Sequence, residues 1–194
     1  GPLEVRPLAV AAFLEGPGVV IEERPLPVGK VGPGLGEHPR PQEPPADTPI
    51  EGSWRVVEMH QAYPDGRTQP LHPRESFFLF AGWDYSMAWA FGDGPSPLYA
   101  ERWKPTEEER LARFGSMLVN AGTFEVDGDR MVVHPRFALA PEFVGGEARF
   151  RFSFAGDTLI LSWDETYSVD GVPYPSDGVS TLLRLVRSGA APGA

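Results

Sequence analysis

Residues 147–154 read EARFRFSF, and residues 158–164, which read TLILSWD, follow them closely. Apolar and polar side chains alternate in both segments, which is typical of strands that bury one face. Phe150 and Phe152 share a face of the first segment, and Leu159 and Leu161 share a face of the second. The connecting residues 155–157 (AGD) contain a Gly-Asp pair, which readily adopts the positive φ of a tight turn. The sequence therefore predicts a β-hairpin with one apolar face.

The same alternation recurs along the chain on the N-terminal and C-terminal sides of this hairpin. A second hairpin is predicted where residues 126–129 (VDGD) join strands over 122–126 and 130–137. Further strands are predicted at residues 53–60, 75–81, 85–91 and 181–187, and one more within 165–173. About eight short strands in series indicate an all-β fold, either an up-and-down antiparallel barrel or a sandwich. We favour the closed barrel because it leaves no strand edge exposed.

One helix is predicted between these strands. In residues 105–109 (PTEEE), Thr106 can cap a helix and Glu109 stands three residues later, which forms a capping box. Acidic residues in the first turn also suit the helix dipole. Apolar residues then recur at helical spacing, at Leu111, Phe114, Met117 and Leu118.

Composition excludes several classes of function. The 194 residues carry 17 Lys and Arg against 27 Asp and Glu, a net charge of −10, which speaks against nucleic acid and anionic membranes as partners. No apolar run approaches the length of a membrane-spanning helix. The absence of cysteine excludes disulfides, a thiolate nucleophile, iron–sulfur clusters and Cys-ligated zinc.

Residues 1–49 differ in composition from the rest of the chain. Half of the 22 prolines fall in the first 50 residues, where Phe13 is the only aromatic residue. We therefore predict a Pro/Gly-rich arm or linker over 1–49, a barrel over 50–187 and a flexible tail over 188–194. The arm is expected to pack along the barrel or over its mouth through Leu8, Val10, Phe13, Val19 and Ile21. Its apolar run at residues 8–14 is short for a signal-peptide core, so a cytoplasmic location is favoured over a secreted one.

Several polar residues are candidates for a site inside the barrel. If Trp54 faces inward, a period of two also turns Val56, Glu58 and His60 inward. Burying a carboxylate without partners costs free energy, so a protein places one in its interior mainly where it has a function. Glu58 and His60 are therefore the candidate acid and base of the site. The alternative is a bulge, or a place near the rim, that leaves both in solvent.

The segment 85–91 places Tyr85, Met87, Trp89 and Phe91 on one face. This face points either into the barrel or outward beneath the arm and the helix, and it forms either plain core or the wall of a pocket. His134 is either a base in the pocket or a surface residue of an alternating strand. No histidine spacing fits a metal site, so neither a metal nor a cofactor is expected.

Several motifs resemble those of bacterial lipocalin-like domain proteins, a family of the calycin superfamily. They are GSW at 52–54, AGTFEVDGD at 121–129, PEFVGG at 141–146, FRF at 150–152 and GDTL at 156–159. The resemblance covers about residues 50–187 and implies a closed barrel that binds small molecules. It also implies a floor built from Gly52, Trp54 and a late-strand arginine. The alternation of the strand does not determine whether this arginine is Arg184 or Arg187. We take Arg184 as the expected floor residue.

The expected function is to bind a small apolar or amphipathic molecule inside the barrel. The expected ligand-binding residues are Val56, Glu58, His60, Tyr85, Met87, Trp89, His134, Phe150 and Phe152. One alternative is a cofactor-independent cyclase or isomerase that uses Glu58 or His60 as its acid or base. Another is an interaction protein with a filled barrel. The sequence does not set the ligand or the oligomeric state.

Overall fold

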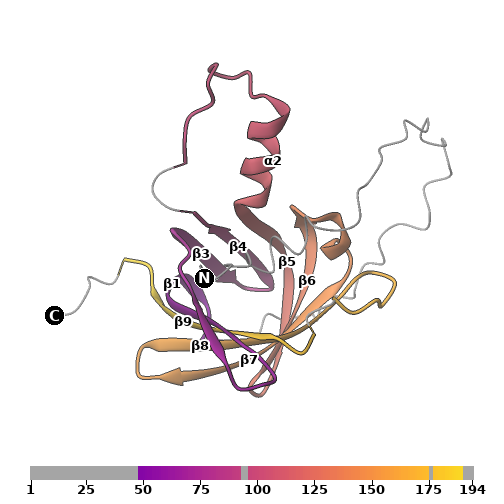
Figure 1. The fold of residues 1–194 in the computed structure, drawn as a ribbon. Coiled ribbons are helices and arrows are strands. Elements are labelled where there is room, and N and C mark those ends of the chain that lie inside the picture. Colours follow the sequence, from indigo (N-terminus) through magenta and orange to yellow (C-terminus); the bar gives the residue numbers. More distant parts are fainter. Residues whose placement is uncertain (1–47, 93–95, 175–176, 190–194) are drawn as a thin grey trace.

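The computed structural model describes residues 48–92, 96–174 and 177–189 (Figure 1). Residues 1–47 and 190–194 lie outside the described part, and with them the predicted packing of the arm and most of the predicted tail. The strands are β1 Gly52–Ala62, β2 Thr68–Leu71, β3 Glu75–Ala81, β4 Asp84–Ala90, β5 Met117–Asp127, β6 Arg130–Ala138, β7 Glu147–Ala155, β8 Thr158–Tyr167 and β9 Ser180–Arg187. The helices are α2 Glu107–Gly115 and the short 3-10 helix η1 Pro141–Phe143.

Eight of the strands form a closed antiparallel barrel. From β3 to β9 each strand pairs with the next, and β1 closes the ring by pairing with both β3 and β9. The first part of β1 pairs with β3, and the last part of β1 pairs with the short strand β2. The predicted up-and-down barrel is therefore confirmed, and β2 is a strand that the sequence analysis did not predict.

The hairpin from which the sequence analysis started is present as β7 and β8. Phe150, Leu159 and Leu161 are buried on its inward face, as the alternation predicts. The turns of the two predicted hairpins contain Gly128 and Gly156, with φ of 61° and 58°, a left-handed conformation that glycine adopts without strain.

The helix begins where predicted but ends earlier. Thr106 Oγ1 accepts a hydrogen bond from the Glu109 N–H at 3.2 Å, and Glu109 Oε2 accepts one from the Thr106 N–H at 2.7 Å, which completes the capping box. Met117 and Leu118, expected on the helix, instead open β5 and pair with β4. Strand pairing with β4 therefore prevails over the helical spacing. Likewise residues 165–173 form no separate strand: β8 continues to Tyr167, which makes an isolated bridge with Pro173.

The barrel has two unlike ends. The floor end carries the tight turns β3–β4, β5–β6 and β7–β8, together with the start of β1 and the end of β9. The α2 end carries the longer connections, and α2 projects from it beside the start of β5 (Figure 1). No residue of α2 is buried. No helix in the described ranges is long and apolar enough to cross a membrane.

Candidate ligand-binding site

The floor end is closed by Trp54 and Arg187. Trp54 is fully buried, and its indole N–H donates to the carbonyl of Ile50 at 2.7 Å. The Arg187 guanidinium lies 4.4 Å from the centroid of the indole ring and donates to the carbonyl of Glu51 at 2.7 Å. Gly52 has a φ of 122°, which other residues adopt only with strain, and a Cβ there would lie 2.4 Å from Nη1 of this arginine and displace it.

The arginine of the floor is therefore Arg187, and the expectation of Arg184 is corrected. Leu183 and Leu185 are buried on the inward face of β9, so the period of two turns Arg184 outward. Its Nε lies 3.3 Å from Glu58 Oε2 on the outside of the barrel.

Glu58 and His60 do not face the interior, which corrects the placement predicted from Trp54 and agrees with the alternative of a bulge. A β-bulge between Val56 and Glu58 shifts the register of β1 against β9 and reverses the alternation. Beyond the bulge Met59 and Gln61 are buried, whereas His60 Nε2 lies 2.7 Å from Glu58 Oε1 in an exposed pair. The bond to His60 holds the pKa of the Glu58 carboxyl below its ordinary value. The alternative function, a cyclase or isomerase, therefore has neither its expected acid nor its expected base inside the barrel.

The interior is lined by large apolar side chains. Tyr85, Met87 and Trp89 occupy successive inward positions of β4 and are buried. Six of the predicted ligand-binding residues belong to this interior or pack against it: Val56, Tyr85, Met87, Trp89, Phe150 and Phe152. Because these side chains are packed together, a ligand that enters must displace part of them.

Aromatic rings gather around Trp89, toward the α2 end. Its ring centroid lies 5.7 Å from that of Phe78 and 5.9 Å from that of Trp163, and the Trp163 contact is edge-to-face. Trp163 in turn stacks on Phe150 with centroids 5.6 Å apart. Leu118, which pairs with Trp89 across the strands, and Trp163 are inward-facing but only partly buried. The wall near the α2 end is therefore aromatic.

Three polar atoms of this interior have no hydrogen-bond partner among the residues that the structure describes. They are the Tyr85 hydroxyl, the Trp89 indole nitrogen and Oδ1 of Asn120. The three residues are 3 %, 2 % and 3 % exposed, so their polar atoms are shielded from solvent. Buried polar atoms are usually hydrogen-bonded, and each unpartnered one costs about 1–3 kcal/mol. This cluster is the most unusual feature of the barrel interior.

The electrostatics of the interior are those of an uncharged site. Among the described residues the buried polar ones are Gln61, Asn120 and Thr166, and no Asp, Glu, Lys or Arg is buried. Burial raises the pKa of the Tyr85 phenol far above its ordinary value, so the hydroxyl keeps its proton at neutral pH. The arrangement can therefore offer two donors, from Tyr85 and Trp89, and one acceptor, from Asn120.

Asn120 is the site residue that the sequence analysis missed. The helical interpretation of Leu118 placed the strand start at Gly122, so Asn120 fell between the two predicted elements. The alternation Leu118, Asn120, Gly122, Phe124 would have revealed it, because it places an asparagine on an otherwise apolar or small face.

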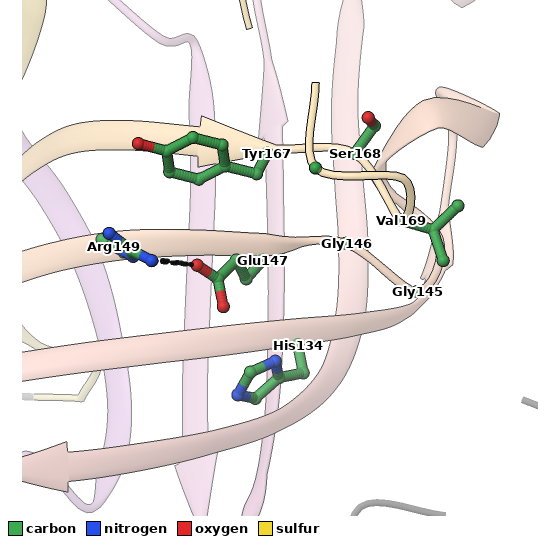
Figure 2. A pocket seen from close by; sticks show the side chains of 9 residues that line it. His134, Gly145, Gly146, Glu147, Arg149, Tyr167, Ser168 and Val169 are labelled. Atoms are coloured by element: carbon green, nitrogen blue, oxygen red, sulfur yellow. Dashed lines mark hydrogen bonds and ion pairs between the residues drawn. The ribbon is translucent and has the colours of Figure 1, made fainter. Parts of the chain in front are cut away.

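His134 lines a hollow outside the barrel rather than the interior. Met131 and Val133 are buried, so alternation on β6 turns His134 outward, where its Nε2 lies 4.0 Å from Glu125 Oε1. The hollow measures about 320 Å³ and is bounded by β6, the start of β7 and the segment after β8 (Figure 2).

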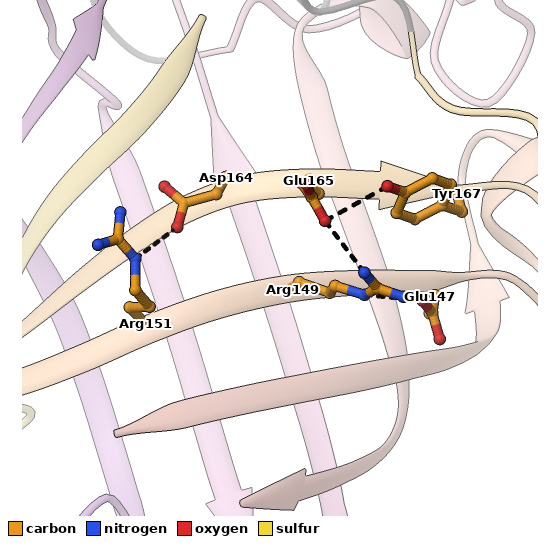
Figure 3. Close-up of polar contacts among 6 residues, drawn as sticks. All are labelled: Glu147, Arg149, Arg151, Asp164, Glu165 and Tyr167. Carbon is orange, nitrogen blue, oxygen red and sulfur yellow. Dashed lines mark hydrogen bonds and ion pairs between the residues drawn. The ribbon is translucent and has the colours of Figure 1, made fainter. Parts of the chain in front are cut away.

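Charged side chains beside this hollow connect β7 to β8 (Figure 3). Arg149 donates to Glu147 at 2.9 Å and to Glu165 at 3.1 Å, and its guanidinium lies 4.9 Å from the Tyr167 ring centroid. The bond to Glu147 raises the pKa of the guanidinium. These charges already have partners, so we assign them a structural role. In the described part of the chain no group of three or more His, Asp or Glu side chains could hold a metal ion.

Comparison with protein-family models supports the motifs. A family model described as a lipocalin-like domain matches residues 51–172. A lipocalin-like protein from Bacteroides uniformis is 13% identical, with a TM-score of 0.39 over 73% of this chain and 100% of that one. An uncharacterized protein from Bacteroides eggerthii is 14% identical, with a TM-score of 0.35 over 69% of this chain and 97% of that one. No protein with a curated description matches the chain.

Proposed function

Because this chain belongs to the lipocalin-like domain family, we propose that its barrel binds one small apolar or amphipathic molecule. The observation that carries the proposal is the set of unpartnered polar atoms of Tyr85, Trp89 and Asn120 in an otherwise apolar interior. A ligand that hydrogen-bonds to them would relieve a cost of about 1–3 kcal/mol for each atom. The aromatic rings around them supply apolar area for the rest of the ligand.

We place the access route at the α2 end, because the floor end is covered by Trp54 and Arg187. Leu118 and Trp163 are the partly exposed inward residues that flank Trp89. Met87 lies directly opposite Asn120, and its unbranched side chain adapts its shape readily. Binding therefore needs Met87 to move and Leu118 to leave a passage.

The test is a fluorescence titration with 1-aminoanthracene, a neutral probe whose emission rises in apolar surroundings. Wild type should bind it saturably at one site. Leu118→Trp should weaken binding by at least about tenfold by filling the passage, and Met87→Ala should strengthen it by freeing space. Val119→Trp is the matched control, since Val119 is the neighbouring outward position on β5. Circular dichroism establishes that each variant is folded.

Equal effects of Leu118→Trp and Val119→Trp would place the probe on the outer surface and refute the proposal. An emission increase that never saturates, with Met87→Ala indistinguishable from wild type, would refute it as well.

A further inference from the structure

We infer that the polar end of the ligand is an uncharged group with a carbonyl oxygen next to an N–H, such as a carboxamide, which faces Tyr85, Trp89 and Asn120. This inference rests on the proposed function and specifies its ligand class. It depends on the placement of the three side chains, on the donors and acceptor they present, and on the charge of the interior.

The three side chains lie on one patch of the wall. Across β4 and β5, Asn120 is directly opposite Met87, Gly122 is opposite Tyr85, and Leu118 is opposite Trp89. Asn120 is therefore the diagonal neighbour of both Tyr85 and Trp89, at a separation of about 7–8 Å between backbones. Gly122 has no side chain to fill the place opposite Tyr85. Tyr85 and Trp89 stand four residues apart on β4, about 13 Å along the strand, so a ligand group that meets all three polar atoms lies over Asn120, between the two aromatic side chains.

The hydrogen-bonding groups define what fits. The indole N–H of Trp89 can only donate, and Oδ1 of Asn120 can only accept. The Tyr85 hydroxyl, protonated in its buried place, supplies the second donor. The complementary group has an oxygen with two lone pairs for Tyr85 and Trp89, and an adjacent N–H for Asn120. A carboxamide has this pattern, whereas a ketone or ester lacks the donor.

The absence of buried charge among the described residues argues against ionic ligands. A carboxylate would meet two donors but would face Asn120 Oδ1 without a proton, and no buried Lys or Arg compensates its charge. An ammonium group could bind Asn120 but has no lone pair for Tyr85 or Trp89. The neutral class is therefore preferred over both ionic classes.

Isothermal titration calorimetry with three matched naphthalene probes tests the inference on the full-length chain. We expect 2-naphthamide to bind at least about tenfold more tightly than 2-acetylnaphthalene, which lacks the donor. We expect 2-naphthoate to bind weaker still. A naphthoate that binds as tightly as the amide, or a ketone that equals the amide, would overturn the inference.

Variants assign the preference to these residues. Asn120→Leu should bring the affinities of amide and ketone within about twofold of each other, and Tyr85→Phe should weaken both. Gln61→Met is the control, because Gln61 is buried but its Oε1 already lies 3.2 Å from the Tyr63 hydroxyl, so its loss should leave the preference unchanged. Failure of all three probes to bind would count against the proposed function, whereas equal binding of all three would overturn only the inference.

Discussion

The indole nitrogens of three tryptophans are placed differently in this barrel. Trp54 donates to the carbonyl of Ile50, and Trp163 donates to Thr166 Oγ1 at 2.8 Å. Trp89 is buried almost as deeply as Trp54, and its indole nitrogen has no hydrogen-bond partner in the described part of the chain. The indoles of Trp54 and Trp163 thus donate hydrogen bonds within the barrel. The indole of Trp89, on the same wall as Tyr85 and Asn120, donates none to a described residue.

Tyr85→Phe should stabilise the ligand-free protein. The change removes a buried hydroxyl without a partner and keeps the ring, so the free energy of unfolding in urea should rise by about 1 kcal/mol. Tyr63→Phe is the matched control, because the Tyr63 hydroxyl lies 3.0 Å from Gln69 Oε1 and its loss should destabilise. A clear loss of stability in Tyr85→Phe would show that its hydroxyl is satisfied after all.

The two arginines of β9 should differ in their contribution to stability. Arg187→Ala removes the cation over the Trp54 ring and its hydrogen bonds to the carbonyls of Glu51 and Pro49, and should cost about 2 kcal/mol. Arg184→Ala breaks an exposed pair with Glu58 and should cost less than about 1 kcal/mol. Chemical denaturation of both variants measures the difference. Equal losses would contradict the assignment of Arg187 to the floor.

Sequence alternation predicted the placement of some site residues and failed for others. The shared face of Tyr85, Met87 and Trp89 followed from a period of two that nothing interrupts on β4, whereas the period did not determine whether that face points inward. The same rule failed for Glu58 and His60, because one extra residue in β1 forms a bulge. A bulge depends on the partner strand, which a period within one segment does not contain.

At the scale of elements, β7 and β8 are joined by paired charges as well as by backbone bonds. Arg151 Nε donates to Asp164 Oδ2 at 2.8 Å (Figure 3). The Ser162 hydroxyl donates to Oδ1 of the same carboxyl at 2.6 Å. Burial alone would raise the pKa of the Asp164 carboxyl, but the two hydrogen bonds outweigh it, so the pKa lies below its ordinary value.

This shift predicts a stability that depends on pH. A carboxyl with a depressed folded-state pKa contributes stability that is present above its unfolded pKa, about 3.9, and is lost as the pH falls through the folded value. Asp164→Asn should therefore lower the free energy of unfolding by up to about 1 kcal/mol near neutral pH. In strong acid the free energies of unfolding of Asp164→Asn and wild type should become equal. Urea unfolding across this range, with the exposed Glu142→Gln as control, measures it, and a gap that persists in acid would contradict the account.

The helix shows where local patterns stop being informative. Its start followed from Thr106 and Glu109, whose capping bonds are local. Its end did not, because Met117 and Leu118 are held by pairing with Ala90 and Trp89 of β4. That error also hid Asn120, so one misplaced boundary removed a site residue from the prediction.

At the scale of the whole molecule, closure of the barrel was predictable and its interior was not. Serial short strands with tight turns favour a closed sheet, and β1 closes it by pairing with both β3 and β9. Which polar atoms inside remain without partners depends on distances across the barrel between strands far apart in sequence. The lack of partners for these atoms among the described residues and the choice of Arg187 for the floor emerged only from the assembled structure.

The most direct test of the account is the indole region of a ¹H–¹⁵N spectrum while 2-naphthamide is added. The chain has five tryptophans, and Trp89→Phe identifies the signal of Trp89. The account predicts that the Trp89 signal shows the largest change, because its N–H gains an acceptor, and that the Trp54 signal stays in place. A Trp89 signal that does not move, while that of the 92 % exposed Trp103 does, would contradict binding inside the barrel.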